Sequence, residues 1–184
     1  PLSWDGSKWV FKAPPAPRPL LNLSKINADK NSSILVVEGE KTCDAAQKLF
    51  PKSICTTWAS GCKAINKTDW KPLKGRKIVL FPDNDQVGFD AMDRLAQLLF
   101  SIGVETIRQV NPPDDAKQGW DLADATWTTK EAIQFVKQRY FYVGKKEQVE
   151  ELETKVTDAI VESEETGKPL PESIEKLISF MEET

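Results

Sequence analysis

Four short runs typical of strands, separated by stretches with helical periodicity, constrain the fold of this chain more than any other feature. The first run, residues 34–37, is a continuous stretch of Ile, Leu and Val, which is typical of a strand buried on both faces. The other runs lie at 53–58, 76–81 and 104–110, and helical spacing follows at 42–50 and 88–100. This alternation predicts an α/β fold with a sheet of about four mainly parallel strands flanked by helices.

The segments on either side of this pattern differ from it in composition. Residues 1–32 contain Pro14, Pro15, Pro17 and Pro19, which predicts an extended, stiff N-terminal segment with little independent fold. We expect the α/β domain to span 33–127 and a C-terminal helical extension to span 128–184, with helices near 128–140, 146–163 and 171–181. A first residue other than Met suggests a piece of a longer protein.

Charge is distributed unevenly along the 184 residues, which together carry a formal net charge of −3. Residues 145–184 hold 12 acidic residues and 5 lysines, a balance of −7, so residues 1–144 carry +4. An acidic tail on a mildly basic body is compatible with a polyanionic ligand for the body.

The chain contains no histidine, and this excludes several kinds of site within it. A Ser-His-Asp triad, a Cys-His dyad and a His-liganded zinc site all need that residue. The three cysteines, Cys43, Cys55 and Cys62, form no C-x-x-C pair, which favours thiols in a reducing, cytoplasmic compartment. No stretch approaches 18 apolar residues, so we expect no membrane span. A metal would therefore have to be held by oxygen atoms.

Acidic residues follow three of the predicted strands, at the point where each strand ends. These residues are Glu38, Asp83, Asp85, Asp121 and Asp124. The carboxyl ends of parallel strands meet at one edge of a sheet, so these carboxylates should repel one another unless cations or protons offset their charge. Mg²⁺ or Mn²⁺ would be a suitable partner. Each cluster also has a simpler interpretation, in which the carboxylates cap helices or form Asx turns.

Basic, glycine and aromatic residues near the same edge are candidates for binding phosphate or bases. Gly39 and Lys41 follow Glu38, and Gly61 and Lys63 follow the second strand, where free backbone N–H groups and an ammonium group could hold phosphate. Trp120 lies beside Asp121 and could stack on a base. Solvated surface lysines and a packed tryptophan are the alternatives.

The motifs Val36-Val37-Glu38-Gly39-Glu40-Lys41 and Phe81-Pro82-Asp83-Asn84-Asp85-Gln86-Val87-Gly88 resemble the paired motifs of the TOPRIM fold. The run Gly119-Trp120-Asp121-Leu122-Ala123-Asp124-Ala125 is similar to the version in phage and mobile-element primases. The resemblance covers residues 33–127 and implies that Glu38 is a catalytic glutamate and that Asp83 and Asp85 bind metal. The third motif is D-x-x-D instead of D-x-D, so either Asp121 or Asp124 is the matching ligand.

The resemblance implies a DNA primase-like nucleotidyltransferase, acting in DNA replication as the TOPRIM catalytic part of a larger protein. Its expected partners are nucleoside triphosphates, a single-stranded DNA template and a replicative helicase, with Mg²⁺ or Mn²⁺ as cofactor. No zinc-binding module or basic template-binding subdomain is evident, so the chain alone could be inactive in primer synthesis. The alternatives are a metal-dependent TOPRIM nuclease and a non-catalytic module that docks nucleic acid or protein.

Overall fold

The computed structural model describes residues 3–11, 13–144 and 146–182. The chain divides into two compact units, Pro1–Val143 and Gly144–Thr184, and each is described by itself. Among the described residues, no helix combines the length and apolar character needed to cross a bilayer.

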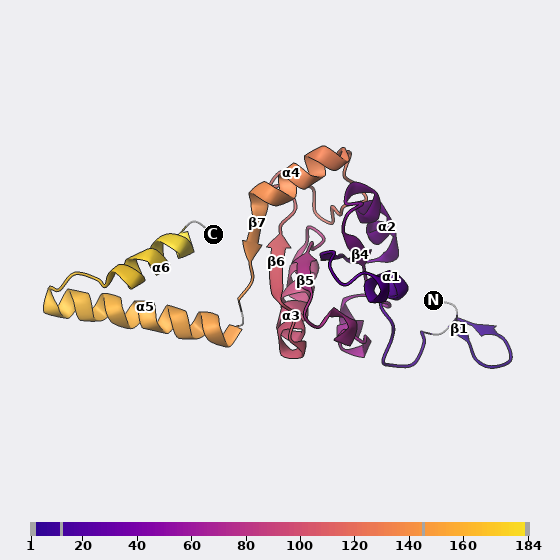
Figure 1. The fold of residues 1–184 in the computed structure, drawn as a ribbon, viewed down its shortest axis with the longest axis horizontal. Helices are drawn as coiled ribbons and strands as arrows, with labels where there is room; N and C mark the ends of the chain where they lie inside the picture. Colours follow the sequence, from indigo (N-terminus) through magenta and orange to yellow (C-terminus); the bar gives the residue numbers. More distant parts are fainter. Residues whose placement is uncertain (1–2, 12, 145, 183–184) are drawn as a thin grey trace. The chain divides into compact units, whose positions relative to one another are not determined.

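The first unit is built on a five-stranded sheet of mixed direction. Its strands are β3 (Ile34–Val36), β4 (Ile54–Thr56), β5 (Lys77–Leu80), β6 (Thr106–Val110) and β7 (Tyr140–Tyr142), in the order β4-β3-β5-β6-β7. The first four strands are parallel, and this confirms the predicted α/β class. Strand β7 pairs with β6 in the opposite direction, and their arrowheads point opposite ways in Figure 1. We had expected the helix at 128–140 to include Tyr140, so β7 is an addition to the predicted sheet.

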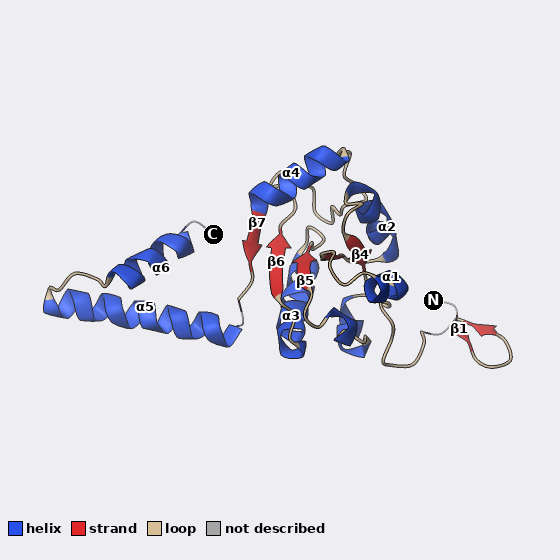
Figure 2. Cartoon of the chain, viewed as in Figure 1, coloured by secondary structure: helices blue, strands red, loops and turns tan. Residues whose placement is uncertain are grey.

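Helices cover both faces of the sheet, as Figure 2 shows. The helices are α1 (Leu23–Ala28), α2 (Glu40–Leu49), α3 (Gln86–Ile102) and α4 (Thr129–Arg139), with short 3₁₀ helices η1 (Cys62–Lys67) and η2 (Lys71–Leu73). Side chains alternate along a strand, so Ile34 and Val36 pack with α1, α3 and both 3₁₀ helices, whereas Leu35 packs with α2 and α4. Strand β3 is therefore buried on both faces, in accord with its continuous apolar sequence.

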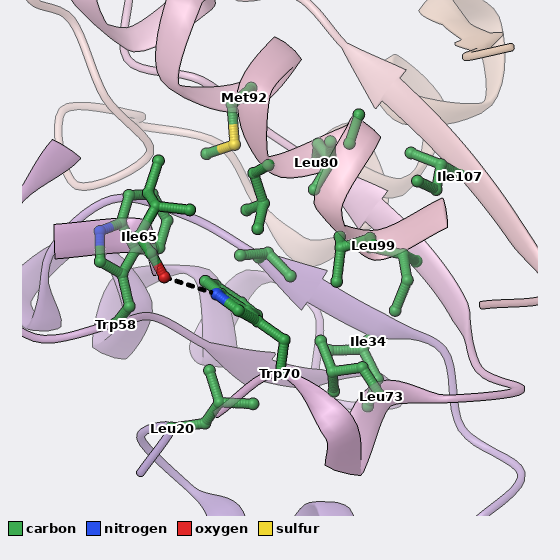
Figure 3. Packing of buried hydrophobic residues seen from close by; sticks show 14 of the residues in the cluster. Leu20, Ile34, Trp58, Ile65, Trp70, Leu73, Leu80, Met92, Leu99 and Ile107 are labelled. Carbon is green, nitrogen blue, oxygen red and sulfur yellow. Dashed lines mark hydrogen bonds between the residues drawn. The ribbon is translucent and has the colours of Figure 1, made fainter. Parts of the chain in front are cut away.

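Two tryptophans lie inside the first of these cores (Figure 3). The rings of Trp58 and Trp70 are 5.8 Å apart between centroids, and both side chains are almost completely buried. Trp70 Nε1 donates a hydrogen bond to the Ile65 carbonyl at 2.9 Å, and Trp58 Nε1 donates one to the Gly61 carbonyl at 2.9 Å. Each indole thus contributes apolar surface while its N–H group is satisfied.

The N-terminal segment contains a short hairpin, which the residues around Trp4 and Trp9 predict, and a helix, which the prolines do not predict. Strands β1 (Ser3–Trp4) and β2 (Trp9–Val10) form an antiparallel hairpin, and α1 folds against the sheet. Leu20 and Ile26 are buried in the same core as Trp58 and Trp70. The reason is that apolar side chains past the last proline cover an end of the sheet that would otherwise be exposed.

The second unit consists of two helices, α5 (Lys146–Thr166) and α6 (Glu172–Glu182), as the sequence predicted for the C-terminal extension. Val156 is buried, whereas Ile160 and Val161 on the same helix are exposed.

Arg76, which is 4% exposed, joins α1 to the start of β5. Its Nη1 donates to the Ile26 carbonyl at 3.0 Å and its Nη2 donates to the Ser32 carbonyl at 2.7 Å. We expect Arg76→Met to lower the free energy of unfolding by about 2–3 kcal/mol, because two buried carbonyls lose their donors. Urea unfolding measures this, with the exposed Arg94→Met as the control; equal effects of the two changes would contradict it.

Candidate functional site

Glu38 and Asp83 lie side by side at the carboxyl edge of the sheet because their strands are neighbours in register. Val36 pairs with Leu80 across β3 and β5, and each acidic residue follows within three positions. Gly88, in the first turn of α3, lies between them. A Cβ atom at Gly88 would be 3.0 Å from Glu38 Oε1, 2.7 Å from the Asp83 carbonyl oxygen and 3.1 Å from the Asp83 nitrogen. Only a glycine allows the helix to approach the two carboxylates this closely.

Asp85 and Asp121 each cap local backbone. Asp85 Oδ1 accepts a hydrogen bond from the Gly88 N–H at 2.7 Å and is the N-cap of α3, and Asp121 Oδ1 accepts one from the Ala123 N–H. The capping interpretation therefore holds for one oxygen of each of these residues. It does not account for Glu38 or Asp83, because Glu38 Oε1 and Asp83 Oδ1 are buried and have no hydrogen-bond partner among the described residues.

Burial and mutual repulsion raise the proton affinity of the two central carboxyl groups. The pKa of Asp83 is raised to about 7, chiefly by burial and also by the charges of Glu38, Asp121, Asp85 and Asp124. Burial also raises the pKa of Glu38, with a further contribution from the charge of Asp85. The site therefore favours either protons or cations at these two positions. Acidic residues that follow each of the three strands raise the pKa of Asp83, so all three motifs lie near this side chain.

Cys62 is a member of this site that the sequence analysis did not identify. Its Sγ donates a hydrogen bond to Glu38 Oε2 at 2.8 Å, which leaves the other carboxylate oxygen as the one without a partner. The pKa of the Cys62 thiol is raised to about 11, chiefly by burial and also by Glu38, so the sulfur keeps the proton that it donates. Cys62 begins η1, and only the fold brings that turn against the end of β3.

Asn84, between the two aspartates of the D-x-D motif, holds the third acidic motif in place. Its side-chain Nδ2 donates to the carbonyls of Ala116 at 2.8 Å and Lys117 at 3.0 Å. Its backbone N–H donates to the Trp120 carbonyl at 2.8 Å, and its carbonyl accepts from the Gly119 N–H at 2.9 Å. Four hydrogen bonds therefore attach the loop that precedes Asp121 to the loop of Asp83.

Asp124 differs from Asp121 in its partners. Lys117 Nζ lies 3.8 Å from Asp124 Oδ2, and both side chains are at least a third exposed, so this ion pair is weak. The charge of Asp121 raises the pKa of Asp83 more than the charge of Asp124 does. This difference favours Asp121 as the nearer of the two carboxylates, although the D-x-x-D motif brings both to the site.

The donor set fits a hard divalent cation, which prefers carboxylate oxygens. Two buried carboxylate oxygens without hydrogen-bond partners, on Glu38 and Asp83, support this fit. As the side chains stand, no three acidic or cysteine residues in the described part of the chain converge closely enough to hold a metal ion. Rotation of carboxylates would therefore have to accompany binding, with Glu38, Asp83, Asp85 and Asp121 as the available ligands.

The other predicted site residues lie around this edge with different exposures. Gly39 is the N-cap of α2 and has a φ of 78°, and Lys41 in the first turn is exposed. Gly61 has a φ of 69° at the start of η1, and Lys63 is exposed. No ion pair involving either lysine is recorded for the described residues, so both are free to meet a phosphate. These four residues remain predicted phosphate ligands.

Trp120 is half-buried and takes part in a row of aromatic rings. Its ring centroid is 6.2 Å from that of Phe81 and 5.5 Å from that of Trp127, and Trp127 is 4.6 Å from Phe135. The packing alternative therefore applies to part of this side chain. Stacking on a base remains a prediction for the part that is exposed.

Comparisons with known proteins identify one family and a set of solved structures. A family described as "Domain of unknown function (DUF6371)" matches residues 18–84, a segment that includes Glu38 and Asp83 and covers little more than a third of the chain. No curated protein matches the chain.

Several solved structures that are similar to this chain are of DNA primases. A DNA primase domain from Pseudomonas aeruginosa is 15% identical, with a TM-score of 0.49, and the match covers 88% of this chain and 49% of that one. The DnaG primase catalytic domain bound to ssDNA is 17% identical, with a TM-score of 0.48 and coverages of 73% and 44%. The zinc-binding and RNA polymerase domains of the Aquifex aeolicus primase are 18% identical, with a TM-score of 0.48 and coverages of 89% and 39%. The present chain thus spans half or less of these primases.

The close approach at Gly88 predicts an unusual response to alanine. Helix propensity alone would make Gly88→Ala stabilising by about 1 kcal/mol. We expect it instead to destabilise the chain by about 1–3 kcal/mol, because the new methyl group meets the Asp83 backbone. Thermal or urea unfolding measures the change, and Ser101→Ala, on the exposed side of the same helix, is the control. A stabilising Gly88→Ala would show that the helix start has room for a Cβ atom.

The raised pKa of Asp83 predicts that stability depends on pH. The folded chain holds this proton up to about pH 7, whereas an ordinary aspartate loses it near 3.8, so the folded state binds more protons between these values. The neutral carboxyl group makes its full contribution to folding stability below pH 3.8, and this contribution is lost as pH rises through 7. Asp83→Asn imitates the neutral form. We therefore expect its free energy of unfolding to exceed that of the parent by about 1–2 kcal/mol at pH 8 and to equal it at pH 4. The gain is smaller than the whole change in the pKa of Asp83 would give, because the side chain is partly exposed and solvent screens its charge.

Urea titrations in the presence of a chelator, at pH 4 and pH 8, measure this difference. Asp115→Asn, an exposed change of the same kind, should shift neither value. A gain in Asp83→Asn of equal size at both pH values would indicate a cause other than titration.

Proposed function

We propose that this chain is the TOPRIM-like catalytic part of a primase-like replication protein. Its reaction would be divalent-metal-dependent phosphoryl or nucleotidyl transfer, in which a nucleoside triphosphate extends a primer on single-stranded DNA. The observation that carries the proposal is the paired burial of Glu38 and Asp83, each with an oxygen that has no hydrogen-bond partner, within the field of three further carboxylates.

The proposal gives each residue a role that follows from its environment. Asp83 and Asp85, with Asp121 or Asp124, would hold Mg²⁺ or Mn²⁺. A bound cation would offset their charge and polarise phosphate oxygens. Glu38 is suited to act as a general acid or base, because burial raises its pKa above the ordinary value and Cys62 fixes one of its oxygens. Lys41 and Lys63 would contact phosphates from the rim.

The motifs and the carboxylate cluster support phosphoryl or nucleotidyl transfer as the reaction class. They do not specify which nucleic-acid product is made. Template binding would use residues outside this chain, whereas a contact with a replicative helicase would use the acidic C-terminal residues 145–184. The substrate and partners of the whole protein are therefore parts of the proposal.

Calorimetric titration with Mn²⁺ tests the site in this chain. We expect the parent to bind Mn²⁺ and the double variant Asp83→Asn, Asp85→Asn to bind at least about tenfold more weakly, because carboxylate ligands are lost. Asparagine is also a good N-cap, so α3 should keep its start. The exposed pair Asp44→Asn, Asp158→Asn is the control, and circular dichroism verifies folding. Equal affinity in parent and site variant would contradict the proposal.

The reaction is tested in the full-length protein that contains this chain. Incorporation of nucleotides on single-stranded DNA that disappears in Asp83→Asn would support the primase assignment. Metal-dependent nicking of duplex DNA without incorporation would favour the nuclease, and DNA binding with neither activity would favour the docking module.

A further inference from the structure

We propose that a pocket beside the acidic site binds the heterocyclic base of the nucleotide whose phosphates meet the carboxylates. The pocket has a volume of about 320 Å³ and lies in the segment between Pro113 and Trp127, with Trp120 and Trp127 in its lining. This inference rests on the proposed function, since it assigns a binding place to part of the same substrate. Its size falls at the lower end of the range for small-molecule sites.

The tryptophans are held in position by packing before any ligand arrives. Their centroids are 5.5 Å apart and their planes are tilted by 51°, so the two rings do not stack flat on each other. Phe81 packs against Trp120 and Phe135 packs against Trp127. A base would therefore meet aromatic surface that loses little conformational freedom on binding, and stacking on indole accepts any base.

The charged groups of the lining favour a neutral heterocycle over a phosphate. Asp115 and Asp124 line the pocket with a single lysine, Lys117, so the balance of charge is negative. A phosphate in the pocket would be repelled, whereas the N–H groups of a base can donate to carboxylates. Thr126 adds a hydroxyl that can donate or accept.

The pocket is structurally joined to the acidic site. Asn84 donates to the carbonyls of Ala116 and Lys117, and both of these residues line the pocket. Asp124 lines the pocket and also contributes to the electrostatic field at Asp83. One rigid loop therefore places an aromatic pocket next to the carboxylates, as a nucleotide with a base and a polyphosphate requires.

The test compares a nucleotide with its phosphate portion alone. Calorimetry of the full chain with saturating Mn²⁺ uses ATP and inorganic tripolyphosphate as separate probes. We expect the parent to bind ATP about tenfold more tightly than tripolyphosphate, with UTP between them because its ring is smaller. Trp127→Leu should bring the affinity for ATP down to that for tripolyphosphate and leave tripolyphosphate unchanged. Trp9→Leu, at an exposed tryptophan of the N-terminal hairpin, should change neither.

A second variant guards against unfolding of the first. Ala125→Leu adds bulk to the pocket lining without removing an aromatic ring, and it should have the same selective effect on ATP. Equal binding of ATP and tripolyphosphate by the parent would overturn the pocket while leaving the phosphate site intact. Equal weakening of both probes in Ala125→Leu would also overturn it. Binding of neither probe by the parent would overturn the proposed function and the pocket together.

Discussion

The repulsion between two half-buried carboxylates, Glu38 and Asp83, is the constraint on which the rest of the site depends. The parallel register of β3 and β5 brings these residues off the sheet at the same level, so they cannot avoid one another. Burial then makes two negative charges costly in the absence of a cation. A fold that needed only stability would not place them here, and this is the physical reason to regard the edge as functional.

The surrounding residues reduce the freedom of these carboxylates without neutralising them. Cys62 holds one oxygen of Glu38, and Gly88 allows the start of α3 to come close enough to exclude water from the other. Asn84 adds the third acidic loop through four hydrogen bonds. Because the connection after β6 is long, sheet register alone would not fix Asp121, and the amide of Asn84 supplies the missing restraint.

The sequence predicted the parts of this arrangement that depend on local pattern. A continuous apolar run marked β3, and shorter strand-like runs marked β4, β5 and β6. Parallel pairing then implied that the acids after three of these strands share an edge. Tyr140–Tyr142 follows a helix without a break, so only its pairing with β6 makes it a strand. Cys62 and Asn84 could not be recognised, because neither residue type signals a site until the fold supplies its partner. Helix α1 was missed for a similar reason, since six residues after a Pro-rich stretch become helical through burial of Ile26.

The sequence presented capping and metal binding as alternatives, but a single carboxylate can do both. One of its oxygens caps the backbone, and the other is available to a metal ion. Asp85 Oδ1 and Asp121 Oδ1 accept backbone N–H groups, and a carboxylate that is fixed through one oxygen presents the other in a defined direction. Asp83 and Glu38 keep buried oxygens without partners. Capping therefore contributes to the pre-organisation of the site, because it fixes the rotamers of Asp85 and Asp121 around the central pair of carboxylates, Glu38 and Asp83. On this view the caps are part of the site, and their replacement by asparagine separates the two contributions: the cap is retained and the charge is removed.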